Sequence, residues 1–401
     1  MTDRSIPALI LCDPQIGALQ VGALSMLDRL IVTLHRAGCR PIRVLCPGEL
    51  PALKRTRAWG IQFEALLHAQ PATEPTLVAT CELLAQPGDV RKAIQGKARL
   101  ATRESDLLPV GVVTPDTFSQ SAAPSLTGRG GAGQGSVESA NSLSARSESV
   151  DRLLQGCARV SAEGVAIRVC DVAGARRAER LLWDSLVSDT DGMVDVYFNR
   201  PLGRCLSKIL IHTPVTPNQI SLISVAIGLV AAYQFAHGEY KASILGGVLF
   251  QISAIVDCID GDIARMVFKE SWIGKWLDIV GDQVVHVAVF IAIAAGGSKG
   301  ALGSNAWLLG ASAVVGALVS FLVVLRGMRL LKDQARTRWQ RRIDQATSRD
   351  FSVLVLALAC FDKLHWFLWM AAVGVHVFWM TALMVQMPAC RRGAGEGISP
   401  Q

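Results

Sequence analysis

The chain has 401 residues, of which 51% are hydrophobic, and it carries a formal net charge of +7. This composition fits one soluble domain followed by one membrane domain, with the basic excess on lipid-facing and cytoplasmic surfaces, so nucleic acid is not an expected partner. The ten cysteines contain no CxxC pair, which argues against a disulfide framework and a zinc site. Met1 leads directly into the polar TDRS, so no cleavable signal sequence is expected.

The N-terminal part, residues 1–188, contains no apolar run long enough to cross a bilayer, so we predict a soluble domain there. PALILCD at Pro7 predicts a buried strand, Leu19–Ala37 an amphipathic helix, and PIRVLC at Pro41 a second strand. This order favours an α/β sheet of Rossmann type. The further predicted strands are Gly60–Leu66, Pro109–Val113 and Val165–Val169, and the further helices are Pro75–Leu84 and Ala173–Leu186.

The first strand and helix, LILCDPQIG and then MLDRLIVTLHRAGCRPIRVL, resemble the start of sugar-type nucleotidyltransferases. These are sometimes fused to a phosphotransferase that uses their CDP-polyol product. Such enzymes place a Gly-rich loop with an Arg and then a Lys at this point to cradle the triphosphate. Here the chain offers Asp13, Pro14, Gln15 and Gly17, and no basic residue before Arg29. We therefore expect a degenerate, non-catalytic nucleotidyltransferase-like domain that binds, scaffolds or regulates.

Within this domain, residues 117–150 are rich in Ser, Gly and Ala and include GRGGAGQGS. A segment so poor in apolar groups cannot offset its ordering entropy, so we predict a disordered insertion. No Lys-Ser or Lys-Thr follows the glycines, as a phosphate-binding loop would require.

Residues 189–217 are predicted to be an interfacial amphipathic helix and a linker, because Val194–Thr213 interleaves apolar and basic residues. Arg204 and Lys208 lie on one face of this helix, where they either contact phosphates of an acceptor or remain solvated beside lipid headgroups. Asn218 is the candidate N-cap of the next helix.

Residues 218–390 read as an α-helical polytopic membrane domain of about six transmembrane helices, followed by a cytoplasmic tail at 391–401. The first and fifth runs are short for a bilayer unless their flanks extend them. The apolar runs are Ile220–Phe235, Ser243–Ile263, Trp276–Ala295, Ala306–Leu325, Phe351–Cys360 and Leu368–Met387.

The distribution of Lys and Arg predicts the orientation in the cell membrane. Eight basic residues lie between Arg326 and Arg349, after the fourth run, and two more follow the sixth, whereas the opposite loops hold only Lys241, Lys299 and Lys363. We therefore expect both termini, and the junction of the second and third helices, on the cytoplasmic side.

Four carboxylates lie at that junction, inside membrane sequence. Asp257 and Asp260 are i, i+3 on one helix face, and Asp278 and Asp282 are i, i+4 on the next helix. Acidic side chains at membrane depth are costly, so four of them without matching bases predict a bound cation. Oxygen ligands alone suit Mg²⁺ or Mn²⁺, which complete their shells with water and substrate phosphate.

Small residues and one arginine accompany these carboxylates. Gly261 and Ala264 leave space for a bulky ligand to approach the backbone, and Arg265 can bind phosphate through its guanidinium. Gly274 leaves similar space one turn before Asp278. Small residues in membrane helices often serve only the close packing of helices. The glycines by themselves are therefore weaker evidence for a ligand site than the carboxylates are.

Written out, the segment is D-x2-D-G-x2-A-R-x8-G-x3-D-x3-D, and it resembles the signature of the CDP-alcohol phosphotransferases without a departure. The resemblance implies an enzyme that displaces CMP from a CDP-linked alcohol and joins the remaining phosphoryl group to the hydroxyl of an acceptor alcohol. It also implies a homodimer. Asp257, Asp260 and Asp278 would be metal ligands, and Asp282 the general base and a further ligand. The cytidine diphosphate site would be lined by Gly261, Ala264, Arg265 and Gly274.

The signature residues recognise the CDP group that all donors of this family share, so the signature does not identify the alcohol of the donor or the acceptor. The donor is either CDP-diacylglycerol with a polar acceptor or a CDP-polyol with a phosphorylated polyol or lipid acceptor, and the fused N-terminal domain favours an inositol-type head group. A different class, a non-enzymatic metal or lipid transporter with an acidic intramembrane site, would need neither Arg265 nor release of CMP.

His286 continues the Asp278, Asp282 series by one turn, and it either supports Asp282 or hydrogen-bonds a neighbouring helix.

Overall fold

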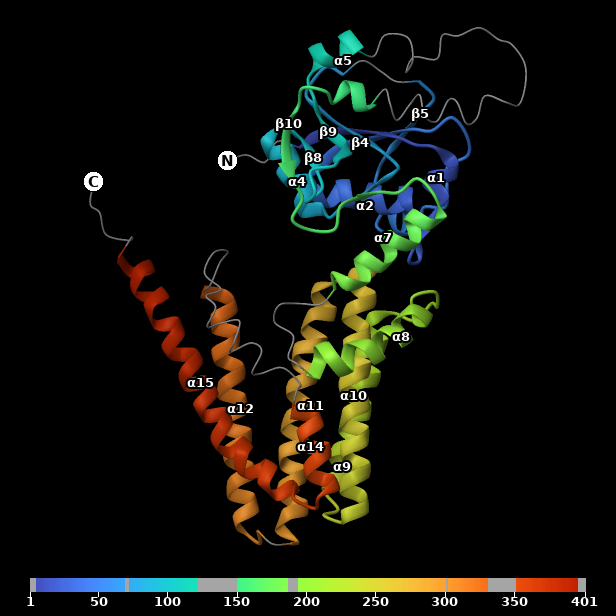
Figure 1. The fold of residues 1–401 in the computed structure, drawn as a ribbon. Coiled ribbons are helices and arrows are strands. Elements are labelled where there is room, and N and C mark those ends of the chain that lie inside the picture. Colours follow the sequence, from blue (N-terminus) through green and yellow to red (C-terminus); the bar gives the residue numbers. More distant parts are fainter. Residues whose placement is uncertain are drawn as a thin grey trace. The chain divides into compact units, whose positions relative to one another are not determined.

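A computed structural model describes residues 5–68, 72–121, 150–186, 194–300, 302–330 and 351–395. The chain forms two compact units: the first is Met1–Leu186 together with Met266–Phe268, and the second is Val187–Arg265 together with Lys269–Gln401. The first contains a sheet with flanking helices and the second is helical (Figure 1). The predicted fold class, an α/β domain followed by a polytopic helical domain, is confirmed.

The N-terminal unit is built on a seven-stranded sheet in the order β10-β8-β9-β6-β1-β4-β5. β1 pairs in parallel with β4 and β6, whereas β9 is antiparallel to both β6 and β8. A parallel strand covered on both faces needs a continuous apolar run, which explains why β1 and β6 are buried almost throughout. The strands are β1 (Ile6–Leu11), β4 (Cys39–Leu45), β5 (Glu64–Leu66), β6 (Thr76–Thr80), β8 (Ala98–Ala101), β9 (Leu107–Val113) and β10 (Ala158–Ser161).

Two predicted helices in this unit are corrected. Pro75–Leu84 is not a helix but contains β6 and the short strand β7 (Leu83–Leu84), because five buried residues in a row form a central strand as readily as a helix turn. The predicted helix at Leu19 begins only at Met26, since Ser25 caps it by accepting the amide of Asp28 at 3.3 Å.

The residues before that cap form the antiparallel pair β2 (Gln20–Val21) and β3 (Leu24–Ser25). Gly38, with φ of 97°, ends the helix in the left-handed conformation. The helices of the unit are α1 (Pro14–Ala18), α2 (Met26–Ala37), α3 (Lys54–Ala58), α4 (Pro87–Gly96), α5 (Pro115–Ser121) and α7 (Val172–Asp184).

The predicted disordered insertion, residues 117–150, overlaps helical structure at both of its ends. Its first residues belong to α5, which ends at Ser121, and residue 150 already starts the next helical turn. The remainder, residues 122–149, lies outside the described residues.

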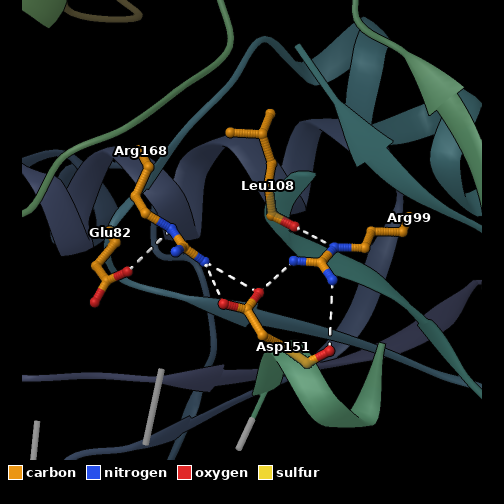
Figure 2. A network of polar contacts seen from close by, with 5 residues as sticks. All are labelled: Glu82, Arg99, Leu108, Asp151 and Arg168. Carbon is orange, nitrogen blue, oxygen red and sulfur yellow. Dashed lines mark hydrogen bonds and ion pairs between the residues drawn. The ribbon is translucent and has the colours of Figure 1, made fainter. Parts of the chain in front are cut away.

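A charged network anchors the chain where it returns after that segment (Figure 2). The carboxylate of Asp151 accepts hydrogen bonds from Arg99 of β8 and, at 3.1 Å, from Arg168 of β11 (Ile167–Arg168). Arg168 also lies 3.4 Å from Glu82, and Arg99 donates to the carbonyl of Leu108 at 2.9 Å. Arg99 is buried, so its charge depends on these partners.

Replacing Asp151 by alanine is expected to lower the free energy of unfolding of the N-terminal unit by about 3 kcal/mol, the lower end of the range for breaking a buried ion pair. The exposed carboxylate of Asp116 on α5 supplies the matched control, Asp116→Ala. Thermolysin digestion of the folded full-length protein, followed over denaturant concentration, measures both. Equal resistance of the two variants would contradict a structural role for the network.

Two buried cysteines of this unit, Cys39 and Cys12, are not reactive thiols. Burial raises the pKa of the Cys39 thiol to about 12. The pKa of the Cys12 thiol is also raised, mainly by its hydrogen bond with Cys81 and secondly by burial. Both thiols therefore stay protonated and weakly nucleophilic at neutral pH.

The C-terminal unit contains five described helices long and apolar enough to cross a bilayer, and a shorter apolar helix, α14. The protein is therefore an integral membrane protein. The predicted basic segment after the fourth run lies largely outside the described residues, as Lys332–Arg349 are not described. The helices are α9 (Pro217–Phe235), α10 (Tyr240–Met266), α11 (Trp272–Ser298), α12 (Asn305–Leu330), α14 (Phe351–Cys360) and α15 (Leu364–Gly395).

Two boundaries differ from the sequence-based expectation. The N-cap of α9 is Thr216 rather than Asn218, because Thr216 and Gln219 form a reciprocal capping box. The first five residues of the predicted tail, 391–395, continue α15 as helix.

Close packing holds the membrane helices together. A Cβ at Gly281 of α11 would lie 2.6 Å from Val225 of α9, and one at Gly228 of α9 would lie 2.7 Å from Val285, so these glycines permit the contact of the two helices. α12 packs along α15 (Figure 1). A row of aromatic rings, Phe250, Phe351, Phe367 and Phe290, joins α10, α14, α15 and α11.

The segment predicted as an interfacial amphipathic helix contains the π-helical turn η1 (Asp195–Asn199) and the helix α8 (Arg200–Leu210). Its large apolar residues Leu206 and Ile209 are exposed, whereas Arg200 and Gly203 are buried. A Cβ at Gly203 would lie 3.4 Å from the carbonyl oxygen of Ile255 on α10. The small and polar face of α8 therefore packs on α10, and the large apolar residues lie on its exposed side.

Candidate functional site

The predicted carboxylates lie on α10 and α11. Asp257 of α10 and Asp278 and Asp282 of α11 each offer one oxygen atom, and these atoms lie within 4.8 Å of one another. No other group of three or more such side chains meets this criterion in the part of the chain that the structure describes. Three carboxylates at this separation repel one another strongly, so the cluster favours a bound divalent cation.

Asp260, the fourth predicted ligand, is not a member of this group. It is buried, and its Oδ2 accepts a hydrogen bond from Ser221 Oγ of α9. The i, i+3 spacing thus brings Asp257 and Asp260 to the same side of α10, but only Asp257 joins the carboxylates of α11.

α9 contributes two serines that the sequence analysis did not identify. Besides Ser221, Ser224 Oγ lies 3.3 Å from Asp257 Oδ1 and 2.8 Å from the carbonyl oxygen of Ser221. Ser253 of α10 donates to the carbonyl of Ser224 at 2.7 Å. The signal was present in the sequence, because Pro217, Ser221, Ser224 and Gly228 form one buried stripe of small residues on an otherwise apolar helix.

Gly261 opens the surface of α10 beside Asp260. A Cβ at this position would meet only the guanidinium of Arg265, at 3.6 Å. Arg265 is partly exposed and extends back over Gly261, held by a 3.0 Å ion pair with Asp262, and Ala264 is half-buried on the same turn. The predicted small residues and arginine therefore form a shelf at the end of α10, with a guanidinium above the glycine.

Gly274 has a different environment from Gly261. A Cβ there would lie 2.9 Å from Asn218 Oδ1 of α9 and 3.0 Å from Ser271 Oγ. Ser271 caps α11 by accepting the amide of Gly274 at 2.9 Å. The absence of a side chain at Gly274 is thus already required by the approach of α9 to the start of α11.

His286 lies one turn below Asp282 on α11, with its ring 5.0 Å from that of Phe351. Asp282, His286 and Ser224 line a cavity of about 10 Å³. A cavity of this size and polarity is at the lower limit for one water molecule. The arrangement places His286 on the same small cavity as the predicted general base, and a supporting role for it stays a prediction.

Comparison with known proteins identifies the region of the chain in which these residues lie. Residues 214–387 match the family model described as CDP-alcohol phosphatidyltransferase. The chain is 30% identical over 216 residues to a "Bifunctional IPC transferase and DIPP synthase" of Rubrobacter xylanophilus, covering 49% of this chain and 45% of that protein.

Two further relatives match shorter regions. An "Archaetidylinositol phosphate synthase" of Pyrococcus horikoshii is 35% identical over 98 residues, covering 24% of this chain and 50% of the relative. A "Phosphatidylinositol phosphate synthase" of Corynebacterium glutamicum is 35% identical over 89 residues, covering 22% and 39%. The chain spans half or less of the length of each of these relatives. Residues 214–387, which contain the carboxylate cluster and the Gly261–Arg265 shelf, are therefore a CDP-alcohol phosphatidyltransferase domain.

Proposed function

We propose that the protein moves a phosphoryl-alcohol group from a CDP-linked alcohol to an acceptor alcohol with release of CMP, in phospholipid or inositol-phosphate biosynthesis. The observation that carries the proposal is the cluster of Asp257, Asp278 and Asp282 beside the shelf of Gly261 and Arg265, within a domain of this family. An anionic pyrophosphate needs a cationic site, and this arrangement supplies one from a metal and a guanidinium.

An inositol-type head group is the favoured substrate. Two of the similar proteins are named as synthases of inositol-containing lipid phosphates. The α/β unit ahead of the membrane domain supports the same head group through its resemblance to the nucleotidyltransferase domains that are fused to such phosphotransferases, although we propose below that this unit is itself inactive. The donor is either the lipid-linked CDP compound or the CDP-polyol, and the assay below distinguishes them.

Mg²⁺ or Mn²⁺ fits the donor set, because the three clustered groups are all carboxylates and neither His nor Cys is among them. Asp257, Asp278 and Asp282 would hold the metal, with Asp260 completing the set. When bound, the metal neutralises charge on the pyrophosphate and on the departing CMP.

The chain's own residues position the reactants and handle the proton. Arg265 binds a phosphate of the donor above Gly261, where no side chain blocks the approach. Asp282 accepts the proton of the acceptor hydroxyl as that oxygen attacks the phosphorus atom. Ser221 fixes the orientation of Asp260 by hydrogen bonding.

For the N-terminal unit we propose a nucleotidyltransferase-like domain that does not transfer nucleotides. The carboxylate of Asp13 accepts the amides of Gln15 and Ile16 at 2.8 and 3.0 Å, directly after β1. In a phosphate-binding loop these amides would face the triphosphate. A negatively charged carboxylate in that position opposes the binding of phosphate. We further propose that both termini are cytoplasmic and that the protein is a homodimer.

CMP release tests the proposed function. The full-length protein in lipid nanodiscs is given Mg²⁺ or Mn²⁺ and either CDP-diacylglycerol or CDP-inositol, against a panel of polyols, polyol phosphates and lipid alcohols. Donor-dependent CMP release is expected with one donor class. Metal binding without CMP release from either donor would favour the transporter class. CTP with a polyol phosphate is included, and release of pyrophosphate from it would contradict the assignment of the N-terminal unit.

Replacing Ser221 by alanine is expected to lower the rate of CMP release about tenfold, as is typical when a group that orients a metal ligand is removed. The variant keeps the carboxylate of Asp260 but loses the hydrogen bond that fixes it. Ser312→Ala is the control, since the half-buried Ser312 also makes a hydrogen bond between helices, to the carbonyl of Ala372 of α15 at 3.3 Å, away from the carboxylates. Equal rates of CMP release for the two serine variants would show that Ser221 does not contribute to the site.

A further inference from the structure

Asp262 is a buried carboxylate that the signature does not specify, since it occupies one of the variable positions between Gly261 and Ala264. Its side chain is 1% exposed. Oδ1 accepts hydrogen bonds from Arg200 Nη1 of α8 at 2.9 Å and from Arg265 Nη2 at 3.0 Å. A buried carboxylate is stable only when it is paired, so Asp262 and the two arginines depend on one another.

The two arginines differ in exposure. The side chain of Arg200 is 9% exposed, whereas that of Arg265 is 39% exposed. Arg265 is therefore fixed at one edge by Asp262 and accessible at the other. A guanidinium carries five N–H donors in a rigid plane, and the described residues occupy only its Nη2 group. Nη2 is also the donor nearest to Gly261, so the remaining donors, Nε and Nη1, are left to bind a phosphate.

We infer that Asp262 is a positioning residue for the nucleotide diphosphate of the donor: it holds the Arg265 guanidinium over Gly261 in the orientation that binds phosphate. The inference rests on the proposed function and names a residue of the same site. An arginine without such an anchor must lose rotamer freedom each time it binds a ligand, and Asp262 removes part of that cost in advance.

Arg200 has the complementary role of pairing with the buried carboxylate of Asp262, at 2.9 Å. It begins α8, which packs on α10 through Gly203. The interfacial helix is thus tied by a charged contact to the residue that positions Arg265. A purely structural role for Asp262, fixing α8 to α10, makes a different prediction, because it would change stability without changing nucleotide affinity.

The test uses full-length protein in nanodiscs and two readouts, the dissociation constant for CDP with Mg²⁺ and the KM and kcat of CMP release. In Asp262→Asn the side chain keeps its shape and an acceptor oxygen but loses its charge, so the hydrogen bond to Arg265 weakens to a neutral-acceptor bond. We expect the dissociation constant and the donor KM to rise about tenfold, with a smaller change in kcat. Asp262→Glu should restore part of the affinity. Asp362→Asn, the same change in an exposed turn, is the control.

A double-mutant cycle with Arg265→Gln separates positioning from independent effects. If Asp262 acts through Arg265, the double variant binds CDP no more weakly than Arg265→Gln alone. The inference would be overturned if the dissociation constant of the double variant rose by the product of the two single increases. It would also be overturned if Asp262→Asn lowered the melting temperature but left the affinity for CDP unchanged. A wild-type protein that neither binds CDP nor releases CMP would contradict the proposed function instead.

Discussion

Asp257→Asn is expected to reduce CMP release by about a thousandfold or more, because it removes a charge from the carboxylates that would hold the metal. Asp257 is the only member of the three-carboxylate cluster that comes from α10, so a metal held by this cluster would lose its ligand from α10. Steady-state CMP release measures the loss.

Metal affinity should fall in the same variant. Changes to residues that merely support ligands cost about 10–100-fold in affinity, so loss of a ligand should cost at least about a hundredfold. Mn²⁺ titration followed by electron paramagnetic resonance gives the value directly. Asp362→Asn again supplies the control, since it removes a carboxylate from an exposed turn of the same domain. An Asp257→Asn protein that binds Mn²⁺ like the wild type would exclude the cluster as the metal site.

Asp282→Asn is expected to lower kcat by about 10²–10⁴-fold, the usual contribution of a general base, while lowering metal affinity much less than Asp257→Asn does. Asparagine retains one oxygen for the cation but cannot accept the proton of the acceptor hydroxyl. The two variants therefore separate the base from the ligands when kcat and Mn²⁺ affinity are measured on the same preparations.

The outcome also decides between the two roles assigned to Asp282. Its oxygen lies in the cluster with Asp257 and Asp278, so a purely ligating role would make Asp282→Asn and Asp257→Asn lose metal affinity equally. Near-normal turnover in Asp282→Asn would exclude both roles. The shared cavity with His286 makes His286→Gln a natural companion variant for the same assay.

Much of the membrane domain was predictable from local sequence. The spacing of Asp257, Asp260, Asp278 and Asp282 is set by helical periodicity, so their positions on α10 and α11 follow once both segments are recognised as helices. Apolar runs identify the membrane helices for the same reason, since a bilayer imposes a minimum length on each. Short buried runs are ambiguous, which is why Pro75–Leu84 was wrongly predicted to be a helix.

The contacts that complete the site were decided by tertiary structure. No spacing within α10 indicates that Asp257 approaches α11 while Asp260 accepts a hydrogen bond from Ser221, because both partners come from other helices. The pairing of Arg200 with Asp262 joins residues 62 positions apart. Sequence alone determined which groups are candidates for the chemistry, through periodicities that act within one helix. The packing of α8, α9, α10 and α11 determined which of those groups meet, because that depends on the close approach that small residues such as Gly203, Gly228 and Gly281 permit.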